Sequence, residues 1–148
     1  MLFRNDLLIK DITQQFNDHT IKVEENEDKV TLTFSENNNK RFVVCITDEI
    51  TLYFGRWCGH YEFTDDEYER FLWDVKDILN NRAFALSAFV GDHMYINYLA
   101  RQGYESADEF MDDDPRERVG LHKTGAVIEC VYYDDSKNRT FEIKKGSE

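Results

Sequence analysis

The amino-acid sequence predicts an α+β fold in which an antiparallel sheet of about six to eight strands carries two main helices packed on one face. Short apolar–polar alternations follow one another along the chain with turn residues between them, which is typical of hairpins and antiparallel pairing. Two segments instead repeat apolar residues every three or four positions, as amphipathic helices do. With 148 residues, of which 41% are hydrophobic, the chain is expected to form a single domain over residues 1–148.

The pattern of apolar residues in the first part of the chain predicts a helix and four strands. Leu8, Ile12 and Phe16 recur every four residues, so residues 5–17 are expected to form an amphipathic helix. Alternating or wholly apolar runs then predict strands over residues 21–25, 30–34, 42–46 and 50–54. The segments between these strands are rich in asparagine and acidic residues, which favour turns. After Gly55 the chain is expected to leave the sheet.

A capped helix follows. Thr64 and Glu67 have the spacing of a capping box, and Phe63 and Tyr68 have that of a hydrophobic staple. Apolar residues then recur on one face of the helix as far as Leu79. The rest of the chain predicts strands over 84–90 and 94–98, a short helix that starts near Ser106 and ends before Pro115, and a closing hairpin over 126–132 and 141–143.

Composition narrows the possible functions. Thirty acidic residues against eighteen lysines and arginines give a net charge of −12, which disfavours direct binding to nucleic acid or anionic membranes and favours a basic protein partner. Three cysteines cannot all pair, and the chain has neither a signal segment nor a long apolar stretch, so a cytoplasmic location is expected. Phosphate loops, dinucleotide fingerprints and paired zinc-ligand motifs are absent from the sequence, so we expect no cofactor and no metal.

The first candidate binding element is the acidic segment 105–117. Its carboxylates, set against one arginine, belong to Glu105, Asp108, Glu109, Asp112, Asp113, Asp114 and Glu117. A basic partner would relieve the repulsion among so many like charges, which predicts a docking surface; a solvated loop is the alternative. The aspartate run lacks the central glycine of a calcium-binding loop.

The second candidate is the segment 54–63, between the fourth strand and the capped helix. Trp57, His60 and Tyr61 are of the aromatic type that anchors protein interfaces, although Trp57 and Tyr61 could instead close the core. Cys58 and His60 lie two residues apart, so in an extended segment they would point the same way. A cysteine nucleophile with a histidine base is therefore a further alternative, as is a zinc site.

The run Ile50-Thr51-Leu52-Tyr53-Phe54-Gly55-Arg56-Trp57-Cys58-Gly59-His60-Tyr61 resembles strand ends of small bacterial immunity proteins, which neutralise polymorphic toxins. The resemblance implies an acidic, cytoplasmic α+β protein that binds a toxin domain. Together with the charge, it favours a non-enzymatic immunity protein or inhibitor that occludes the active site of a cationic toxin, such as a nuclease. A small-molecule or peptide binding domain with a pocket between sheet and helix is the alternative. Edge strands such as 21–25 or 140–144 could also pair between copies of the chain.

Overall fold

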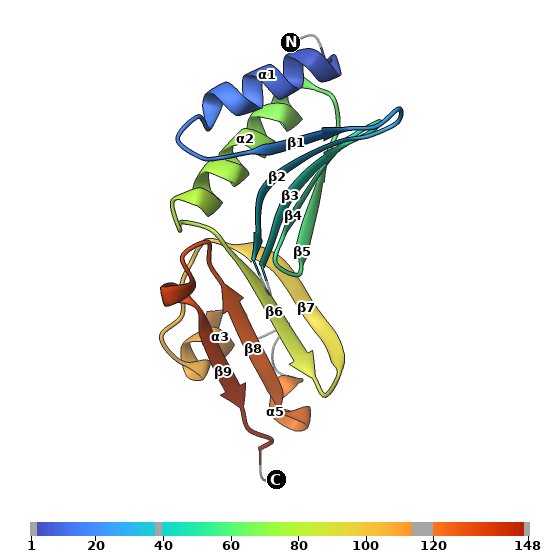
Figure 1. Cartoon of the computed structure of the whole chain (residues 1–148). Helices are drawn as coiled ribbons and strands as arrows, with labels where there is room; N and C mark the ends of the chain where they lie inside the picture. The colour runs from blue at the N-terminus through green and yellow to red at the C-terminus, as the bar shows by residue number, and fades with distance from the viewer. Residues whose placement is uncertain (1–2, 38–39, 114–119, 147–148) are drawn as a thin grey trace. The chain divides into compact units, whose positions relative to one another are not determined.

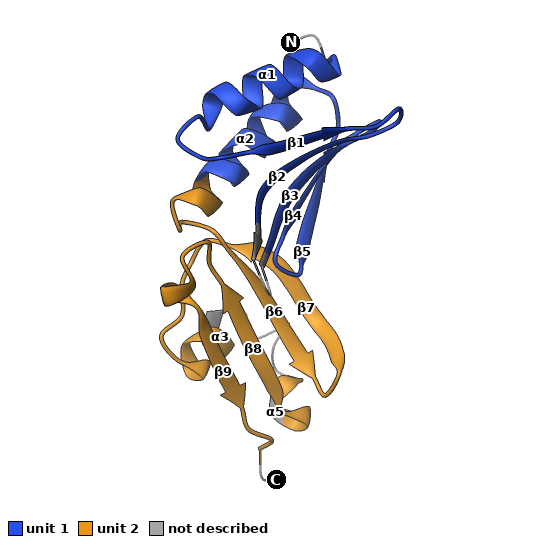
Figure 2. Ribbon diagram, in the orientation of Figure 1, with its two compact units in different colours: residues 1–76 blue, residues 77–148 orange. Residues whose placement is uncertain are grey.

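The chain forms two compact units, residues 1–76 and 77–148, which Figure 2 shows in blue and orange. The structure is a computed structural model that describes residues 3–37, 40–113 and 120–146. Within these residues the strands form two antiparallel sheets, one of five strands and one of four (Figure 1). The predicted α+β class and antiparallel pairing are confirmed, but the strands divide between two sheets. Side-chain alternation predicts where strands lie and not which strands pair, so the number of sheets could not be read from it.

The first unit contains two helices and the larger sheet. Its elements are α1 (Asn5–Gln15), β1 (Lys22–Glu25), β2 (Val30–Asn37), β3 (Lys40–Ile46), β4 (Ile50–Phe54), β5 (Trp57–Tyr61) and most of α2 (Asp65–Leu79). The strands pair in chain order, from β1 at one edge to β5 at the other. The fifth strand corrects the expectation that the chain leaves the sheet after Gly55. A positive φ of 57° at this glycine allows a tight turn, after which Trp57 pairs with Phe54.

Both main helices cover one face of this sheet, as predicted (Figure 1). Phe16, at the end of α1, contacts Phe34 of β2 with 5.9 Å between ring centroids. Phe71 of α2 contacts Tyr61 of β5 at 5.4 Å. The facing strand residues form the core and are fully or almost fully buried: Val30, Leu32, Phe42, Val44, Ile46, Ile50, Leu52 and Phe54. We call this the inner face of the sheet and the opposite one its outer face.

The second unit has its own core. Its elements are β6 (Phe84–Val90), β7 (His93–Ala100), α3 (Ala107–Asp113), α5 (Leu121–Thr124), β8 (Ala126–Val131), a short 3₁₀ helix (Asp135–Lys137) and β9 (Arg139–Ile143). The strand order is β7-β6-β8-β9. Phe110 of α3 and Leu121 of α5 are buried in one cluster with Leu86 and Ile128 from the sheet. The predicted tight turn at Gly91 is present, with a φ of 61°.

The sheet edges and the character of the helices were also predicted from the sequence. The segments 21–25 and 140–144 were expected to supply edge strands, and β1 and β9 do lie at sheet edges. Among the described helices, none has the length and apolar character that crossing a membrane requires.

Candidate functional site

One end of the first unit's sheet brings together three segments that are distant in the sequence. A row of paired residues crosses β1 to β5 at this end: Glu25, Val30, Ile46, Ile50 and Tyr61. Beyond the row lie the turn 26–29, the turn 47–49 and the segment 62–64 that leads into α2. Neighbouring strands are about 4.8 Å apart, so these segments are spread along an edge of only about 19 Å.

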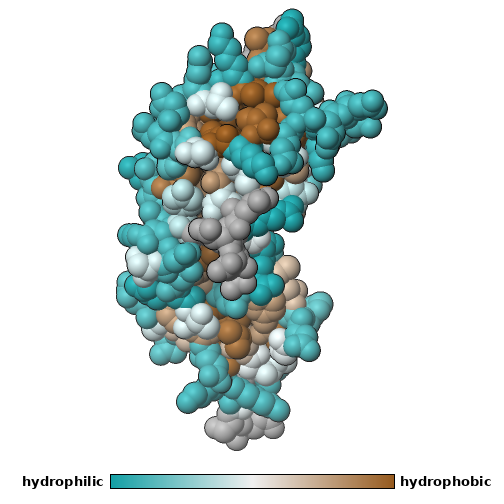
Figure 3. Space-filling model, viewed as in Figure 1, coloured by the Kyte–Doolittle hydropathy of each residue, from teal (hydrophilic) through white to brown (hydrophobic). Residues whose placement is uncertain are grey.

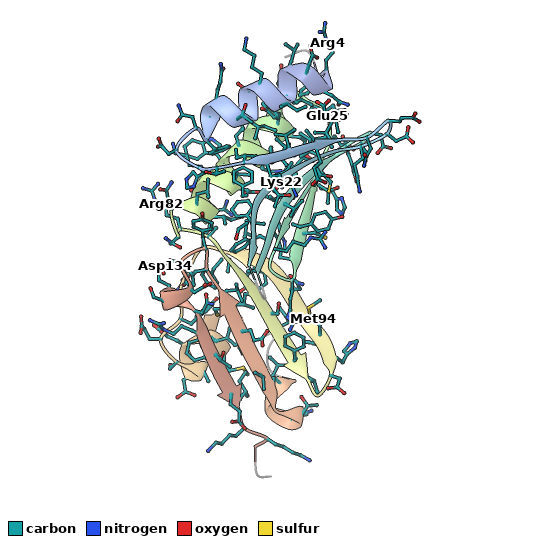
Figure 4. The ribbon with its side chains drawn as sticks, in the orientation of Figure 1. Arg4, Lys22, Glu25, Arg82, Met94 and Asp134 are labelled. Atoms are coloured by element: carbon teal, nitrogen blue, oxygen red, sulfur yellow. The ribbon has the colours of Figure 1, made fainter. Side chains whose placement is uncertain are left out.

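This end of the sheet carries a concentration of carboxylates, which we call the acidic rim. Its members are Glu25, Glu27, Asp28, Asp48, Glu49, Glu62, Asp65 and Asp66. Glu49 is half-buried and the others are exposed. Lys29 is the one basic residue in the same stretches of sequence, so the rim has a strongly negative potential. The turn between β1 and β2 projects from the sheet in Figure 1 and is hydrophilic in Figure 3, and Figure 4 labels Glu25.

Arg70 of α2 holds the last rim segment against β5. Its guanidinium donates to the Glu67 carboxylate, with Nε–Oε2 2.8 Å and Nη2–Oε1 3.1 Å, and to the carbonyl oxygen of His60 at 3.1 Å. These hydrogen bonds from Arg70 hold the pKa of the Glu67 carboxyl below its ordinary value. The rim segment between β5 and α2 is therefore anchored at both ends, which keeps its carboxylates in place.

The three aromatic residues predicted to bind a partner divide between the two faces of the sheet. The indole of Trp57 is half-buried on the inner face, where it lies across Gly59: a β-carbon on that glycine would stand 2.8 Å from Cη2 and Cζ2 of the ring. His60 is exposed on the outer face. Its Nδ1 lies 2.9 Å from Glu49 Oε1, a rim carboxylate, and 3.2 Å from Thr51 Oγ1. Of the three, His60 is the residue that borders the rim.

Tyr61 is a core residue, which corrects its assignment to the partner surface. Its side chain is 0% exposed. The hydroxyl donates to Oδ2 of buried Asp74 at 2.5 Å, and the Arg70 guanidinium lies 4.4 Å from the ring centroid. The tyrosine therefore joins β5 to α2 from within. Alternation along β5 turns Tyr61 toward the helices, as it does Trp57.

The acidic segment 105–117 lies in the second unit and is partly helical. Glu105 and Asp108 are exposed, but Glu109 helps to cap α3: its Oε2 accepts from the Glu105 amide at 2.6 Å, while its own amide donates to Ser106 Oγ at 3.2 Å. The predicted capping signal at Ser106 is thus confirmed. Asp112 and Asp113 belong to the last turn of α3, and their side chains, like the whole of Asp114, lie outside the described residues.

Cys58 lies on the outer face of β5 and is exposed, whereas Cys45 is half-buried and Cys130 is buried; all three are free thiols. Cys58 and His60 share one face of the strand, as an extended segment requires. The carboxylate that contacts His60 is that of Glu49, which lies against Nδ1 of the ring. In the part of the chain that the structure describes, no group of three or more histidine, cysteine, aspartate or glutamate side chains is arranged to hold a metal ion.

The acidic rim was not predicted, because its carboxylates come from three separate turns, each of which resembles an ordinary solvated turn in the sequence. One feature of the sequence could have predicted it: the turns 26–29 and 47–49, which lie on the same side of a meander of strands, are both acidic. No protein-family model, curated protein or solved structure matches the chain.

Proposed function

We propose that this chain is a non-enzymatic protein-binding module, an immunity protein or similar inhibitor, which binds a cationic toxin domain and occludes its active site. The acidic rim is the observation that carries the proposal: one end of the sheet and the first turn of α2 carry eight carboxylates, and the basic residues beside them are Lys29 and Arg70. A surface of this charge attracts a basic protein and accelerates the encounter. The resemblance of residues 50–61 to immunity proteins supports the same function.

The rim's scaffold suits rapid and tight association. Its segments are short turns between paired strands, and Arg70 bonds both to Glu67 and to the end of β5. A surface that is already ordered loses little conformational freedom on binding, so more of the interaction energy appears as affinity. Like-charge repulsion within the free rim would also be relieved by a positively charged partner.

The test measures binding to the toxin candidate encoded by the reading frame next to the gene for this chain. The rim variant combines Glu27→Gln, Asp28→Asn and Glu62→Gln, which are all exposed. A matched control removes the same charge elsewhere through Asp18→Asn, Asp92→Asn and Glu142→Gln, also exposed. We expect the rim variant to lose about tenfold in affinity at low salt, mainly through slower association, and the control to lose far less.

A third variant, Glu105→Gln with Asp108→Asn, tests the other acidic surface, on α3. Growth protection by co-expression reports the same interaction in cells. Undetectable affinity for the toxin candidate at low salt would overturn the proposal. Equal losses in the rim variant and the matched control would show that total charge, and not the rim, determines binding.

A further inference from the structure

Trp73 is an exposed aromatic residue that the core of the first unit does not use. Its side chain lies on α2 and is 52% exposed, whereas Phe71, Val75 and Ile78 of the same helix are fully buried. Exposing a large apolar ring to water is unfavourable, and tryptophan is strongly enriched among the residues that dominate binding energy at protein interfaces. The position of this ring on the helix therefore bears on how a partner is bound.

The exposed face of α2 leads from the acidic rim to Trp73. Asp66, a rim residue, and Glu69 precede the tryptophan by seven and four positions, and Lys76 follows it by three. These spacings place the four side chains along one side of the helix, and all four are exposed. Two helical turns separate Asp66 from Trp73, a distance of about 10 Å along the axis. A partner seated on the rim can therefore reach Trp73 without spanning a gap.

The ring of Trp73 already lies beside a cation. Lys76 Nζ is 5.0 Å from the centroid of the indole, within the range of a cation–π interaction. Glu69 lies one turn back along the same side, at the i, i+4 spacing that makes side chains neighbours on a helix surface. An aromatic face next to a carboxylate matches arginine better than lysine, because a guanidinium can stack on the ring while its N–H groups bond to the carboxylate.

We propose that Trp73 and Glu69 form a binding site for an arginine side chain of the same basic partner that docks on the acidic rim. This inference rests on the proposed function and extends it from net charge to a specific contact. The rim would attract the partner by charge, and Trp73 would give arginine-rich segments an advantage over lysine-rich segments of equal charge. The arginine would compete with Lys76 for the indole.

The test uses decaarginine and decalysine peptides as probes, since they carry equal charge and differ in the planar group. Trp57→Phe leaves Trp73 as the single tryptophan of the chain, so its fluorescence reports directly on the site. We expect decaarginine to change this emission and to bind about fivefold more tightly than decalysine at low salt. Isothermal titration calorimetry measures the variants that lack this reporter: Trp73→Ala should remove the preference, and Glu69→Gln should reduce it.

Tyr95→Ala is the matched control, because this ring is 60% exposed and lies in the other unit. It should leave both affinities unchanged. If Trp73→Ala alters neither affinity while Glu27→Gln, Asp28→Asn and Glu62→Gln weaken both, the arginine site is wrong and the charge-based function stands. If neither peptide binds even at low salt, the arginine site is wrong, whereas the proposed function depends on affinity for the toxin candidate.

Discussion

The hydroxyl of Tyr61 shows how one polar atom can connect two elements inside a core. It donates to Asp74 at 2.5 Å, and the side chains of both residues are buried, so the bond is shielded from water. A buried carboxylate that loses a hydrogen-bond donor is destabilised more than an exposed one, since water cannot replace the donor. The anchoring of β5, and with it one end of the acidic rim, therefore depends on this contact.

We predict that Tyr61→Phe lowers the free energy of unfolding by about 1–3 kcal/mol, because the ring remains but the buried Asp74 carboxylate loses the hydrogen bond from this hydroxyl. Urea denaturation followed by circular dichroism measures the change. Tyr95→Phe removes a hydroxyl from a side chain that is 60% exposed, and it should cost less than about 0.5 kcal/mol. Equal stability of the Tyr61 variant and the native chain would contradict the assigned role.

The ionisation of the Cys130 thiol at high pH tests whether this side chain is buried. Burial raises the pKa of its thiol from 9.0 to about 12. The unfolded chain releases this proton at lower pH than the folded chain. The stability that depends on a neutral thiol is therefore fully present below pH 9 and is lost as the pH rises toward 12.

We therefore expect the free energy of unfolding of the native chain to fall more steeply above pH 9 than that of Cys130→Ala, which has no thiol to ionise. The substitution costs stability at neutral pH, so the gap between the two proteins should narrow as the pH rises. Urea titrations from about pH 7 to pH 10.5 measure both profiles. Parallel profiles would contradict the prediction.

Among the elements, α2 is the one whose start is most clearly encoded. The Glu67 amide donates to Thr64 Oγ1 at 3.2 Å, which confirms the cap. The Glu67 carboxylate, expected to complete the capping box, bonds instead to Arg70. A third ring, Phe3, connects the two residues of the predicted staple: it stacks on Phe63 at 5.6 Å and meets Tyr68 edge-on at 6.0 Å.

Thr64→Ala should destabilise the protein by about 1 kcal/mol, because the first turn of α2 loses a hydrogen-bond acceptor. Thr13→Ala is the matched control: this threonine bonds to the carbonyl oxygen of Ile9 within α1, and such a bond contributes little to stability. Thermal unfolding of the two variants compares them directly. Unchanged stability of Thr64→Ala would contradict the contribution assigned to this cap.

Over the molecule as a whole, negative charge is distributed and not confined to the segment 105–117. The first unit has sixteen acidic against nine basic residues, and the second has fourteen against nine, which together account for the net charge of −12. The rim supplies eight of the first unit's carboxylates. Repulsion on this scale opposes the folded state, in which the charges are closest together.

Added salt should therefore stabilise this protein. We predict that the melting temperature rises between about 20 mM and 500 mM NaCl, because the screening length falls from more than 20 Å to about 4 Å. The rim variant Glu27→Gln, Asp28→Asn, Glu62→Gln should show a smaller rise, since it has three fewer negative charges at one end of the sheet. A melting temperature that falls over this range would mean that ion pairs such as Arg4–Asp6 outweigh the repulsion.

Local patterns in the sequence were enough to predict the α+β class, both main helices, most strands and the two capping residues Thr64 and Ser106. Each of these features depends on interactions between residues close together in the chain, such as an amide bonding to a hydroxyl three positions away. The fifth strand was missed because Trp57 to Tyr61 contains glycine and mixed polarity, and its pairing with β4 follows from the turn at Gly55.

Pairing between distant segments decided everything else. Strand pairing divided the strands between two sheets and aligned three acidic turns into one rim. The register of β5 against β4 turned Tyr61 and Trp57 toward the helices and His60 away from them. The composition already contained the surplus of carboxylates. Their concentration at one end of a sheet arises only when residues tens of positions apart become neighbours in five paired strands, which lie about 4.8 Å apart.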